Sequence, residues 1–283
     1  MINKIKRKIK TFSIVKKYAI SSSLEIIIAY LNKSKKIRLK GFSVPLSWKD
    51  AKDIAYAYYF GWVIEEGKSF KYKNKGDGRI LEIPFEKKDI FSEDFNELYG
   101  IFDYKNKKVL DVGAYIGDTA LFFLSKGAIY VEAYEPIKEN VDLIKKNFKK
   151  EIKEKKLKIL DYALYSNDGE KNFYVDKKSI GRKNFGIMEG KEKISIKTLG
   201  WDSVLRRGNY DIAKVDCEGG ERYLAFCDWK LLKGIPLWQI ETHNKEINSL
   251  LKRKFKVSGF KLIKEIRLNR KISIVYFKGD WGG

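Results

Sequence analysis

The stretch Val109-Leu110-Asp111-Val112-Gly113-Ala114-Tyr115-Ile116-Gly117-Asp118-Thr119 decides the fold of this chain. Its first four residues form a short apolar run typical of a buried strand, and from Ile116 to Lys126 apolar residues recur at helical spacing. We therefore predict a strand that ends in a glycine-bearing turn and opens a helix. A glycine in this turn lets the backbone approach a ligand without a Cβ clash, and the helix start offers unpaired N–H groups.

Strand and helix patterns alternate from this point to the end of the chain. A second strand is expected at 129–134 and a second helix at 137–148, and five further strands follow, at 157–163, 212–215, 237–240, 260–266 and 272–277. Such alternation predicts an α/β fold with a seven-stranded, mostly parallel sheet covered by helices on both faces. The last two strands are joined at 268–270, which is too short for a helical crossover, so that pair is expected to be antiparallel.

The first 104 residues do not follow this pattern, and we predict a small N-terminal α+β extension at 1–104 before the main domain at 105–283. Residues 1–40 are basic and amphipathic, with Ile2, Ile5, Ile9 and Phe12 near helical spacing. The favoured interpretation is a helix packed on the body with a solvated Lys face. The alternative is peripheral contact with an anionic membrane or a nucleic acid. Residues 62–64 and 79–83 predict a hairpin around 74–78.

The composition describes a well-packed globular protein of 283 residues with a formal net charge of +22. One explanation of the charge is an anionic partner such as RNA, DNA, an anionic membrane face or a phosphorylated glycan. The favoured explanation is heat adaptation, because Lys- and Glu-rich surfaces with few thermolabile residues are typical of thermophiles. Gln239 is the only glutamine and His243 the only histidine.

The two cysteines, Cys217 and Cys227, are too few for a disulfide framework and form no C-x-x-C motif. We expect two buried free thiols. The apolar run near residues 19–31 is too short to span a bilayer, contains Glu25 and lacks the pattern of a signal peptide. These features predict a cytoplasmic protein.

The loop after the first strand has the chemistry of a site for a cationic cofactor. It contains no G-x-G for a pyrophosphate and it begins with Asp111, which is expected to hold the loop or to orient an amino acid group. Glu135, about one strand–helix–strand unit after Gly113, is expected to accept both hydroxyls of a ribose. The alternative for Glu135 is a helix-capping acid before Pro136. Ala163 is expected beside an adenine, by position only.

Two further polar clusters follow strand ends on the same predicted sheet edge. The sequence Lys214-Val215-Asp216-Cys217-Glu218-Gly219-Gly220-Glu221 places three acids and two glycines in a short turn, and Glu241-Thr242-His243 ends the fifth strand. Asp216, Glu241 and His243 are expected to converge as a general base or as a divalent cation site. The alternative for His243 is a hydrogen-bonded packing residue.

These motifs together resemble the FkbM-type methyltransferase family. The resemblance covers residues 107–277 and rests on DVGAYIGDT at 111–119, AYEP at 133–136, ALYSNDGE at 163–170, KVDCEGGE at 214–221 and IETH at 240–243. It implies a Rossmann-like class I methyltransferase fold that binds S-adenosylmethionine, with Gly113 and Glu135 at the cofactor. It also implies that Asp216, Glu218 and Glu221 lie near the catalytic edge, where Glu218 and Glu221 meet substrate or cation. Tyr115 departs from the Asn of many relatives.

The predicted function is therefore methyl transfer from S-adenosylmethionine to a hydroxyl of a sugar, glycan, lipid or small molecule. An RNA methyltransferase is the first alternative, motivated by the charge. The second is a non-catalytic protein on the same fold that binds a membrane or nucleic acid through residues 1–40. The predicted cofactor pocket comprises Asp111, Gly113, Ala114, Tyr115, Gly117, Asp118, Thr119, Glu135, Pro136 and Ala163.

Overall fold

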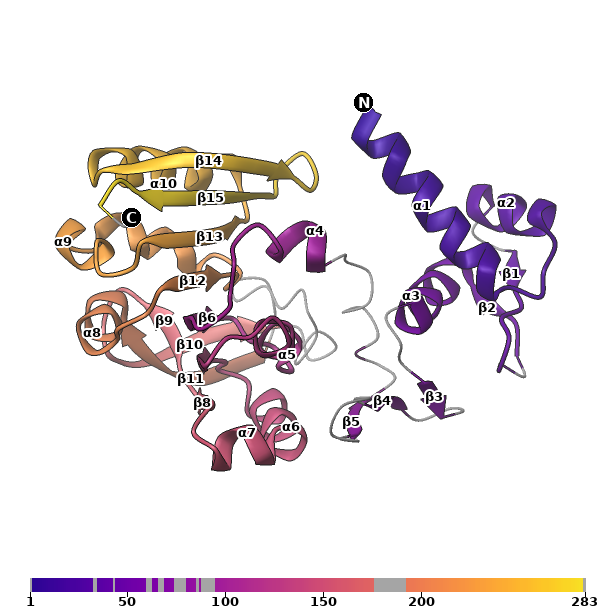
Figure 1. Cartoon of the computed structure of the whole chain (residues 1–283), viewed down its shortest axis with the longest axis horizontal. Coiled ribbons are helices and arrows are strands. Elements are labelled where there is room, and N and C mark those ends of the chain that lie inside the picture. The colour runs from indigo at the N-terminus through magenta and orange to yellow at the C-terminus, as the bar shows by residue number, and fades with distance from the viewer. Residues whose placement is uncertain are drawn as a thin grey trace. The chain divides into compact units, whose positions relative to one another are not determined.

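The computed structural model of the chain describes residues 2–32, 35–42, 44–59, 63–65, 69–73, 80–84, 87, 95–175 and 192–281. The chain divides into two compact units, Met1–Asp94 and Phe95–Gly283 (Figure 1). The second unit contains the predicted site and is described in more detail.

The first unit begins with the helices α1 (Ile2–Tyr18) and α2 (Ser23–Leu31). Two short antiparallel strands, β1 (Lys36–Ile37) and β2 (Leu46–Ser47), lead into α3 (Trp48–Tyr59). The buried residues of α1 are Ile14 and Val15, whereas Ile9 of the predicted stripe is 61% exposed. The residues at helical spacing in this segment therefore lie in a helix, and Ile9 is on its exposed side.

The rest of the first unit contains a three-stranded antiparallel sheet. Its strands are β3 (Val63–Glu65), β4 (Ser69–Lys73) and β5 (Ile80–Pro84), and β4 lies between the other two. The sequence prediction paired the first and third of these segments with each other. A hairpin across 74–78 is present, since β4 and β5 pair antiparallel, but its first strand is 69–73, and the segment at 63–65 pairs with the other edge of β4. The predicted turn at 74–78 lies outside the described residues.

The second unit is built on a seven-stranded sheet with the order β14-β15-β13-β12-β6-β7-β8. Neighbouring strands from β8 to β13 pair in parallel, and β15 is antiparallel to both of its neighbours. The predicted mostly parallel sheet and the antiparallel closing pair are confirmed. The strands are β6 (Lys108–Val112), β7 (Tyr130–Tyr134), β8 (Leu157–Leu160), β12 (Ile212–Val215), β13 (Leu237–Thr242), β14 (Phe260–Arg267) and β15 (Ser273–Gly279).

Helices cover both faces of this sheet, because alternate strand residues point to opposite sides. On one face, α8 (Trp201–Arg207) and α10 (Lys245–Val257) contribute to a core cluster with Leu110, Ala213 and Trp238. On the other face, Gln239 donates a hydrogen bond to the Tyr104 hydroxyl at 2.9 Å. Tyr104 in turn stacks on Phe123 of α5 (Asp118–Ser125). The remaining helices of the unit are α6 (Lys138–Asn147), α7 (Lys149–Lys153), the 3-10 helix η2 (Gly220–Phe226) and α9 (Trp229–Leu232).

The short helix α4 (Phe95–Tyr99) belongs to the second unit, although the sequence analysis assigned residues 95–104 to the N-terminal extension. The physical reason is aromatic packing. Tyr99 makes ring contacts with Phe122 and Phe123 of α5, and the Tyr104 hydroxyl donates to the Tyr99 carbonyl at 2.7 Å. The boundary between the units therefore lies ten residues earlier than predicted.

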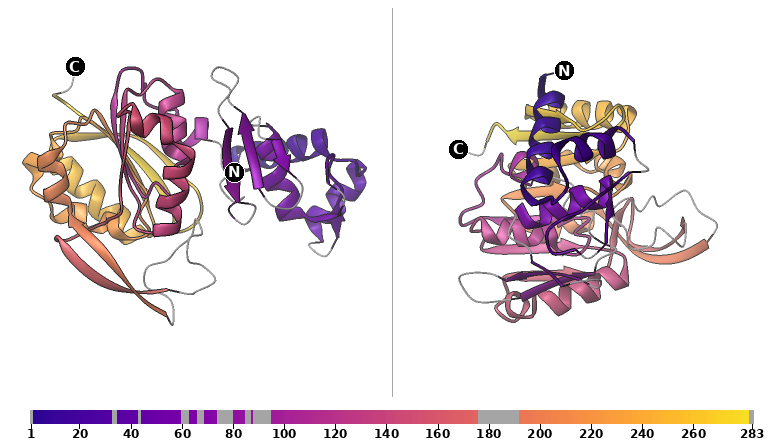
Figure 2. Two further views of the ribbon diagram at one scale, coloured as in Figure 1. Left: turned by 90° about the horizontal axis from the view of Figure 1, so that it is seen from below. Right: turned by 90° about the vertical axis from the view of Figure 1, so that its right-hand side faces the viewer.

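A second, three-stranded sheet of the order β10-β11-β9 adjoins the cofactor edge. It consists of β9 (Ala163–Tyr165), β10 (Gly169–Val175) and β11 (Glu192–Gly200), and Figure 2 shows β10 and β11 as a long twisted ribbon. The predicted third strand at 157–163 is too long, because β8 ends at Leu160 and Ala163 begins β9. Ala163 nevertheless stays close to the sheet edge where it was expected.

The lengths of the helices and the state of the two cysteines bear on two further predictions. None of the helices in the described ranges is long and apolar enough to cross a bilayer. Cys217 and Cys227 are both free, and Cys227 is buried as expected, whereas Cys217 is only partly buried and lines a crevice at the end of β12. Burial raises the pKa of each thiol above its usual value, so neither cysteine has the character of a reactive thiolate.

Candidate active site

A crevice opens at the carboxyl ends of β6, β7 and β12, where a doubly wound sheet binds its ligand. The structure brings together there most of the residues predicted at the cofactor, and it adds Asp216 and Glu218 from the turn after β12. The predicted residues that line the crevice are Gly113, Tyr115, Asp118, Thr119, Glu135, Pro136, Ala163, Asp216 and Glu218.

Gly113 locks the cofactor loop against the turn that carries Asp216. Its φ is +77°, and a Cβ at this position would lie 1.7 Å from the backbone carbonyl oxygen of Asp216. No side chain fits in that space, so the ends of β6 and β12 touch through backbone alone. Tyr115, two residues on, also has a left-handed φ of 50°, which an Asn adopts more readily than a Tyr.

Asp111 lies beneath the loop and not in the crevice wall. It is fully buried, and its Oδ2 accepts a 2.6 Å hydrogen bond from the Thr119 hydroxyl. Its Oδ1 lies 3.2 Å from Nζ of Lys214, a residue that is itself only 2% exposed. Of the two roles predicted for Asp111, this geometry supports holding the loop.

Lys214 is a buried cation that the sequence analysis left without a role. Its Nζ donates to the carbonyl oxygens of Gly113 at 2.7 Å and Val112 at 3.3 Å. Burial lowers the pKa of Lys214, but the nearby carboxylates, with Asp111 first, outweigh burial and raise the pKa above its usual value. A single lysine in the apolar strand Ile212–Val215 is the signal that would have found it.

Ala114 and Gly117 also stand behind the crevice. Ala114 is fully buried, and a Cβ on Gly117 would lie 2.8 Å from the ring of Phe148. Gly117 has a φ of +86° and immediately precedes α5. These two residues therefore shape the loop from inside.

Glu135 follows β7 and its carboxylate is bound by three donors. Oε2 accepts from the Tyr115 backbone N–H at 3.0 Å, and Oε1 accepts from the Ile137 N–H and the Asn140 side chain, both at 3.0 Å. Burial raises the pKa of Glu135 to about 7 against these hydrogen bonds and the charge of Lys214, which lower it. Glu135 thus links the cofactor loop to the start of α6, which agrees in part with the predicted capping role. It also lines the crevice, where the ribose was predicted.

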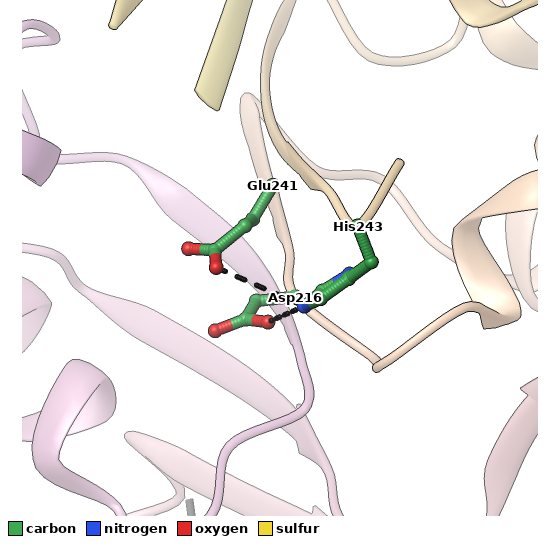
Figure 3. Close-up of side chains that lie close together, drawn as sticks. All are labelled: Asp216, Glu241 and His243. Carbon is green, nitrogen blue, oxygen red and sulfur yellow. Dashed lines mark ion pairs between the residues drawn. The ribbon is translucent and has the colours of Figure 1, made fainter. Parts of the chain in front are cut away.

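The second group of predicted residues converges on His243. Its Nε2 lies 3.5 Å from Oδ1 of Asp216 and 3.7 Å from Oε1 of Glu241, and Figure 3 shows both carboxylates meeting this nitrogen. Glu218 Oε2 lies at 3.4 Å from the same nitrogen. Asp216, Glu241 and His243 each offer a ligand atom within 4.8 Å of the others. We call Asp216, Glu218, Glu241 and His243 the His243 cluster.

Glu221 orients the imidazole ring of His243 through its Nδ1 atom. It is fully buried, and its Oε1 lies 3.0 Å from His243 Nδ1 and accepts from the His243 backbone N–H at 3.2 Å. Burial lowers the pKa of His243, but the hydrogen bond to Glu221 and the surrounding carboxylates raise it to about 10. The ring therefore either carries a proton or gives Nε2 to a metal ion, with Nδ1–H fixed on Glu221 in both cases.

The turn after β12 contains two residues with left-handed backbone conformations, and it carries Glu218 of the His243 cluster. Glu218 has a φ of 50° and Gly219 a φ of +107°. Gly220 leaves no room for a side chain, since a Cβ there would lie 2.9 Å from the Leu164 carbonyl oxygen. A non-glycine residue in the left-handed region is uncommon, and such residues gather at functional sites. The strain at Glu218 coincides with the approach of its carboxylate to His243.

Aromatic side chains form the far wall of the crevice, and the sequence analysis did not identify them. Tyr165 and Tyr223 have ring centroids 4.3 Å apart, and Phe173 contacts Tyr165 edge-on. Arg222 lines the same region. Tyr165 lies in β9 and Tyr223 in η2, so no local motif in the sequence links them.

The chemistry of the crevice fits a cationic nucleoside such as S-adenosylmethionine. Asp118, Asp216 and Glu218 supply negative charge along the wall, and Glu135 adds to it above its pKa of about 7. Negative charge repels a pyrophosphate and attracts a sulfonium or an ammonium group. Ala163 and neighbouring apolar residues supply a surface for a base. Two cations, Lys214 and Arg222, also line the crevice, and the Lys214 ammonium is held by the Gly113 and Val112 carbonyl oxygens and by Asp111.

No protein-family model and no curated protein matches the chain. Among solved structures it is similar to methyltransferase FkbM from Methylobacillus flagellatus KT, with 15% identity over 65% of this chain and 48% of that chain and a TM-score of 0.47. It is also similar to the Methanococcus jannaschii fibrillarin pre-rRNA processing protein, with 14% identity over 77% of this chain and 92% of that chain and a TM-score of 0.45.

A third similar structure is magnesium protoporphyrin IX methyltransferase from Synechocystis PCC 6803, with 10% identity over 65% of this chain and 75% of that chain and a TM-score of 0.41. Membership of the FkbM-type family stays a prediction. The strand order of the main sheet, with β15 alone reversed, gives the second unit of this chain the class I methyltransferase fold.

Proposed function

We propose that this chain transfers a methyl group from S-adenosylmethionine to a hydroxyl oxygen of a sugar, glycan, lipid or small molecule. One observation carries the proposal: Asp216 stands in the crevice wall and, at 3.5 Å from His243 Nε2, also in the His243 cluster. A cofactor crevice and a site that can take a proton or a cation therefore share two residues, Asp216 and Glu218.

The cofactor side of the proposal uses the loop 113–119 and Glu135. The bound cofactor supplies an electrophilic methyl group on a sulfonium. Oε2 of Glu135 accepts one hydrogen bond from Tyr115, and a carboxylate oxygen can accept a second, which is available to a ribose hydroxyl. Asp118 and Asp216 provide negative potential toward the cationic end of the cofactor.

The acceptor side uses Asp216 as the group that takes the hydroxyl proton. Asp216 lines the crevice, whereas His243 lies behind it, held by Glu221 and only 14% exposed at its side chain. Removal of the proton by a positioned base is worth about 10²–10⁴-fold in rate. Alignment of the acceptor oxygen with the methyl carbon contributes about 7–11 kcal/mol of the barrier.

A divalent cation at the His243 cluster is the alternative to Asp216 acting as the base. Asp216, Glu241 and Nε2 of His243 would hold it, and Glu218 lies close enough to join them. Two or three carboxylates with one imidazole suit a Mn²⁺- or Mg²⁺-like ion better than a soft metal. A cation here would lower the pKa of an acceptor hydroxyl, and Asp216 would then serve as a ligand and not as the base.

The aromatic wall supports an acceptor with apolar ring faces. Tyr165, Phe173 and Tyr223 present ring surfaces to the crevice, and Arg222 adds a donor for an oxygen-rich group. This combination suits a sugar or a ring-containing small molecule better than an extended polymer.

The test has two arms. Calorimetry with S-adenosylmethionine should show one binding site per chain, and the protein with methyl-labelled cofactor and fractionated lysate should label glycan, lipid or small molecules. Absence of cofactor binding would overturn the proposal. Label that enters RNA, in a reaction that falls steeply with salt, would replace it with the RNA methyltransferase alternative.

A further inference from the structure

The helix α2 in the first unit carries an apolar face that the described residues leave uncovered. Its other side is fully buried through Ile26 and Ala29. The uncovered residues recur at i, i+3, i+4 and i+7, the spacing of one helix face. They are Leu24, Ile27, Ile28 and Leu31, which are 66%, 43%, 38% and 74% exposed. We call these four residues the α2 stripe. Neighbouring Ile20, at 65% exposure, extends it.

The surroundings of the α2 stripe are basic. Residues 1–40 contain twelve Lys and Arg residues and one acidic residue, Glu25. Glu25 is engaged in the capping box of α2: its Oε2 accepts from the Ser22 N–H at 2.7 Å, and its own N–H donates to the Ser22 hydroxyl. The only acid of this segment is thus bound to the helix start.

The backbones of two basic residues hydrogen-bond next to the two ends of α2. At the first end, the Arg38 N–H donates to the Ser21 hydroxyl at 3.0 Å, one residue before the N-cap. At the other end, the Lys35 N–H donates to the Asn32 carbonyl. Lys8 of α1 places its Nζ 5.7 Å from the centre of the Tyr30 ring. Two cations are thus placed beside α2: the Lys8 ammonium near Tyr30, and the Arg38 charge close enough to Glu25 to act on its carboxylate.

We propose that the α2 stripe and its flanking cations form a docking surface for an anionic lipid membrane, on which α2 lies in the plane of the interface. Acyl chains at the headgroup boundary cover aliphatic side chains, and anionic headgroups pair with Lys and Arg. Tyr30 is 39% exposed and packs edge-on against Trp48, two residue types that favour the interfacial region.

Other occupants suit this surface less well. A nucleic acid pairs with the cations but offers no apolar layer for four aliphatic side chains. A second copy of the chain covers the stripe but brings the same basic residues against it, in a protein of net charge +22. An anionic bilayer complements both the apolar and the charged component.

The test is flotation of the full chain with vesicles of phosphatidylcholine alone or with about 30% phosphatidylserine. We expect binding only to the anionic vesicles and at least tenfold weaker partitioning of Leu24→Gln/Leu31→Gln. The matched control is Phe226→Gln/Val257→Gln, which replaces two side chains that are 75% and 82% exposed in the second unit. This control should bind like the wild type.

The replaced side chains are exposed and Gln is a good helix former, so circular dichroism should show an unchanged fold. Failure of the wild-type protein to bind anionic vesicles would by itself overturn the proposal. So would equal loss in both double variants, or a wild-type dimer in sedimentation that Leu24→Gln/Leu31→Gln converts to a monomer. Tighter binding to single-stranded RNA than to vesicles, lost in the α2 double variant, would assign the surface to nucleic acid.

Discussion

At the scale of single residues, the candidate site depends on groups whose surroundings leave little freedom. Gly113 faces a carbonyl oxygen, Glu135 is bound by three donors, and Lys214 is enclosed by oxygens. Each of these can be tested by one substitution.

Gly113→Ala should disrupt the cofactor loop, because its Cβ would lie 1.7 Å from the Asp216 carbonyl oxygen. We expect about 3 kcal/mol or more of destabilisation from the overlap and the positive φ together, and loss of S-adenosylmethionine binding. Gly127→Ala is the control, since its φ is +91° but its nearest contact is an ordinary 3.4 Å. It should cost about 1–2 kcal/mol and leave cofactor binding intact. Equal melting temperatures for the two variants would contradict the assigned contact.

The affinity for S-adenosylmethionine should rise about tenfold between pH 6 and pH 8, because the ionised form of Glu135 accepts ribose hydroxyls and its pKa is about 7. Glu135→Gln should bind more weakly and lose this part of the pH dependence, and calorimetry at several pH values measures both. A wild-type profile identical in shape to that of the Gln variant would refute the placement of the ribose. Gln is preferable to Ala here, because Ala would strand the N–H groups of Tyr115 and Ile137.

The raised pKa of Glu135 also determines how the stability of the fold changes with pH. The folded protein holds the Glu135 proton more tightly than the unfolded chain, in which the pKa has its ordinary value of 4.5. The stability contributed by Glu135 is therefore complete below about pH 4.5 and is lost as pH rises through about 7. Cofactor binding and fold stability thus respond to Glu135 in opposite directions over the same pH range.

At the scale of elements, the central strands β6 and β12 carry the site, and Lys214 of β12 fixes the loop after β6. Lys214→Met should destabilise the protein by about 3–5 kcal/mol, because Asp111 is left as an unpaired buried charge. Lys214→Met/Asp111→Asn removes both charges and should recover part of that loss in urea unfolding. A double variant no more stable than the single one would show that the two residues do not interact.

The 3-10 helix η2 supports β13 through Glu221. If Glu221 orients His243, Glu221→Gln should weaken Mn²⁺ binding about 10–100-fold. The exposed Glu246 of α10 offers a matched Gln substitution that should not change the affinity. Titration calorimetry with Mn²⁺ separates the two. Undiminished binding in Glu221→Gln would remove Glu221 from the proposed cation site.

Most of the main sheet was predictable because hydrophobic runs and glycine turns are local signals. The convergence of Asp216, Glu241 and His243 was also predictable, because residues after parallel strands meet at one edge. The sheet β9-β10-β11 was not predicted, although residues 192–200 of β11 alternate polar and apolar side chains as a half-buried strand does. The Tyr165–Tyr223 pair joins segments far apart in sequence, and pattern analysis does not detect such contacts.

At the scale of the whole molecule, each of the two units has its own buried residues, which predicts separate unfolding. Scanning calorimetry should show two transitions. S-adenosylmethionine at 100 times its Kd should stabilise one of them by about 2.7 kcal/mol and leave the other in place. A single transition that moves to higher temperature on adding cofactor would contradict this prediction, because it would show that the two units unfold together.

The presence of a single histidine in the chain has a practical consequence for spectroscopy. Histidine-selective isotope labelling gives one imidazole signal, and it arises from the ring between Glu221 and Asp216. Magnetic resonance of the unmodified protein can therefore follow proton loss, paramagnetic metal entry and cofactor arrival at one atom.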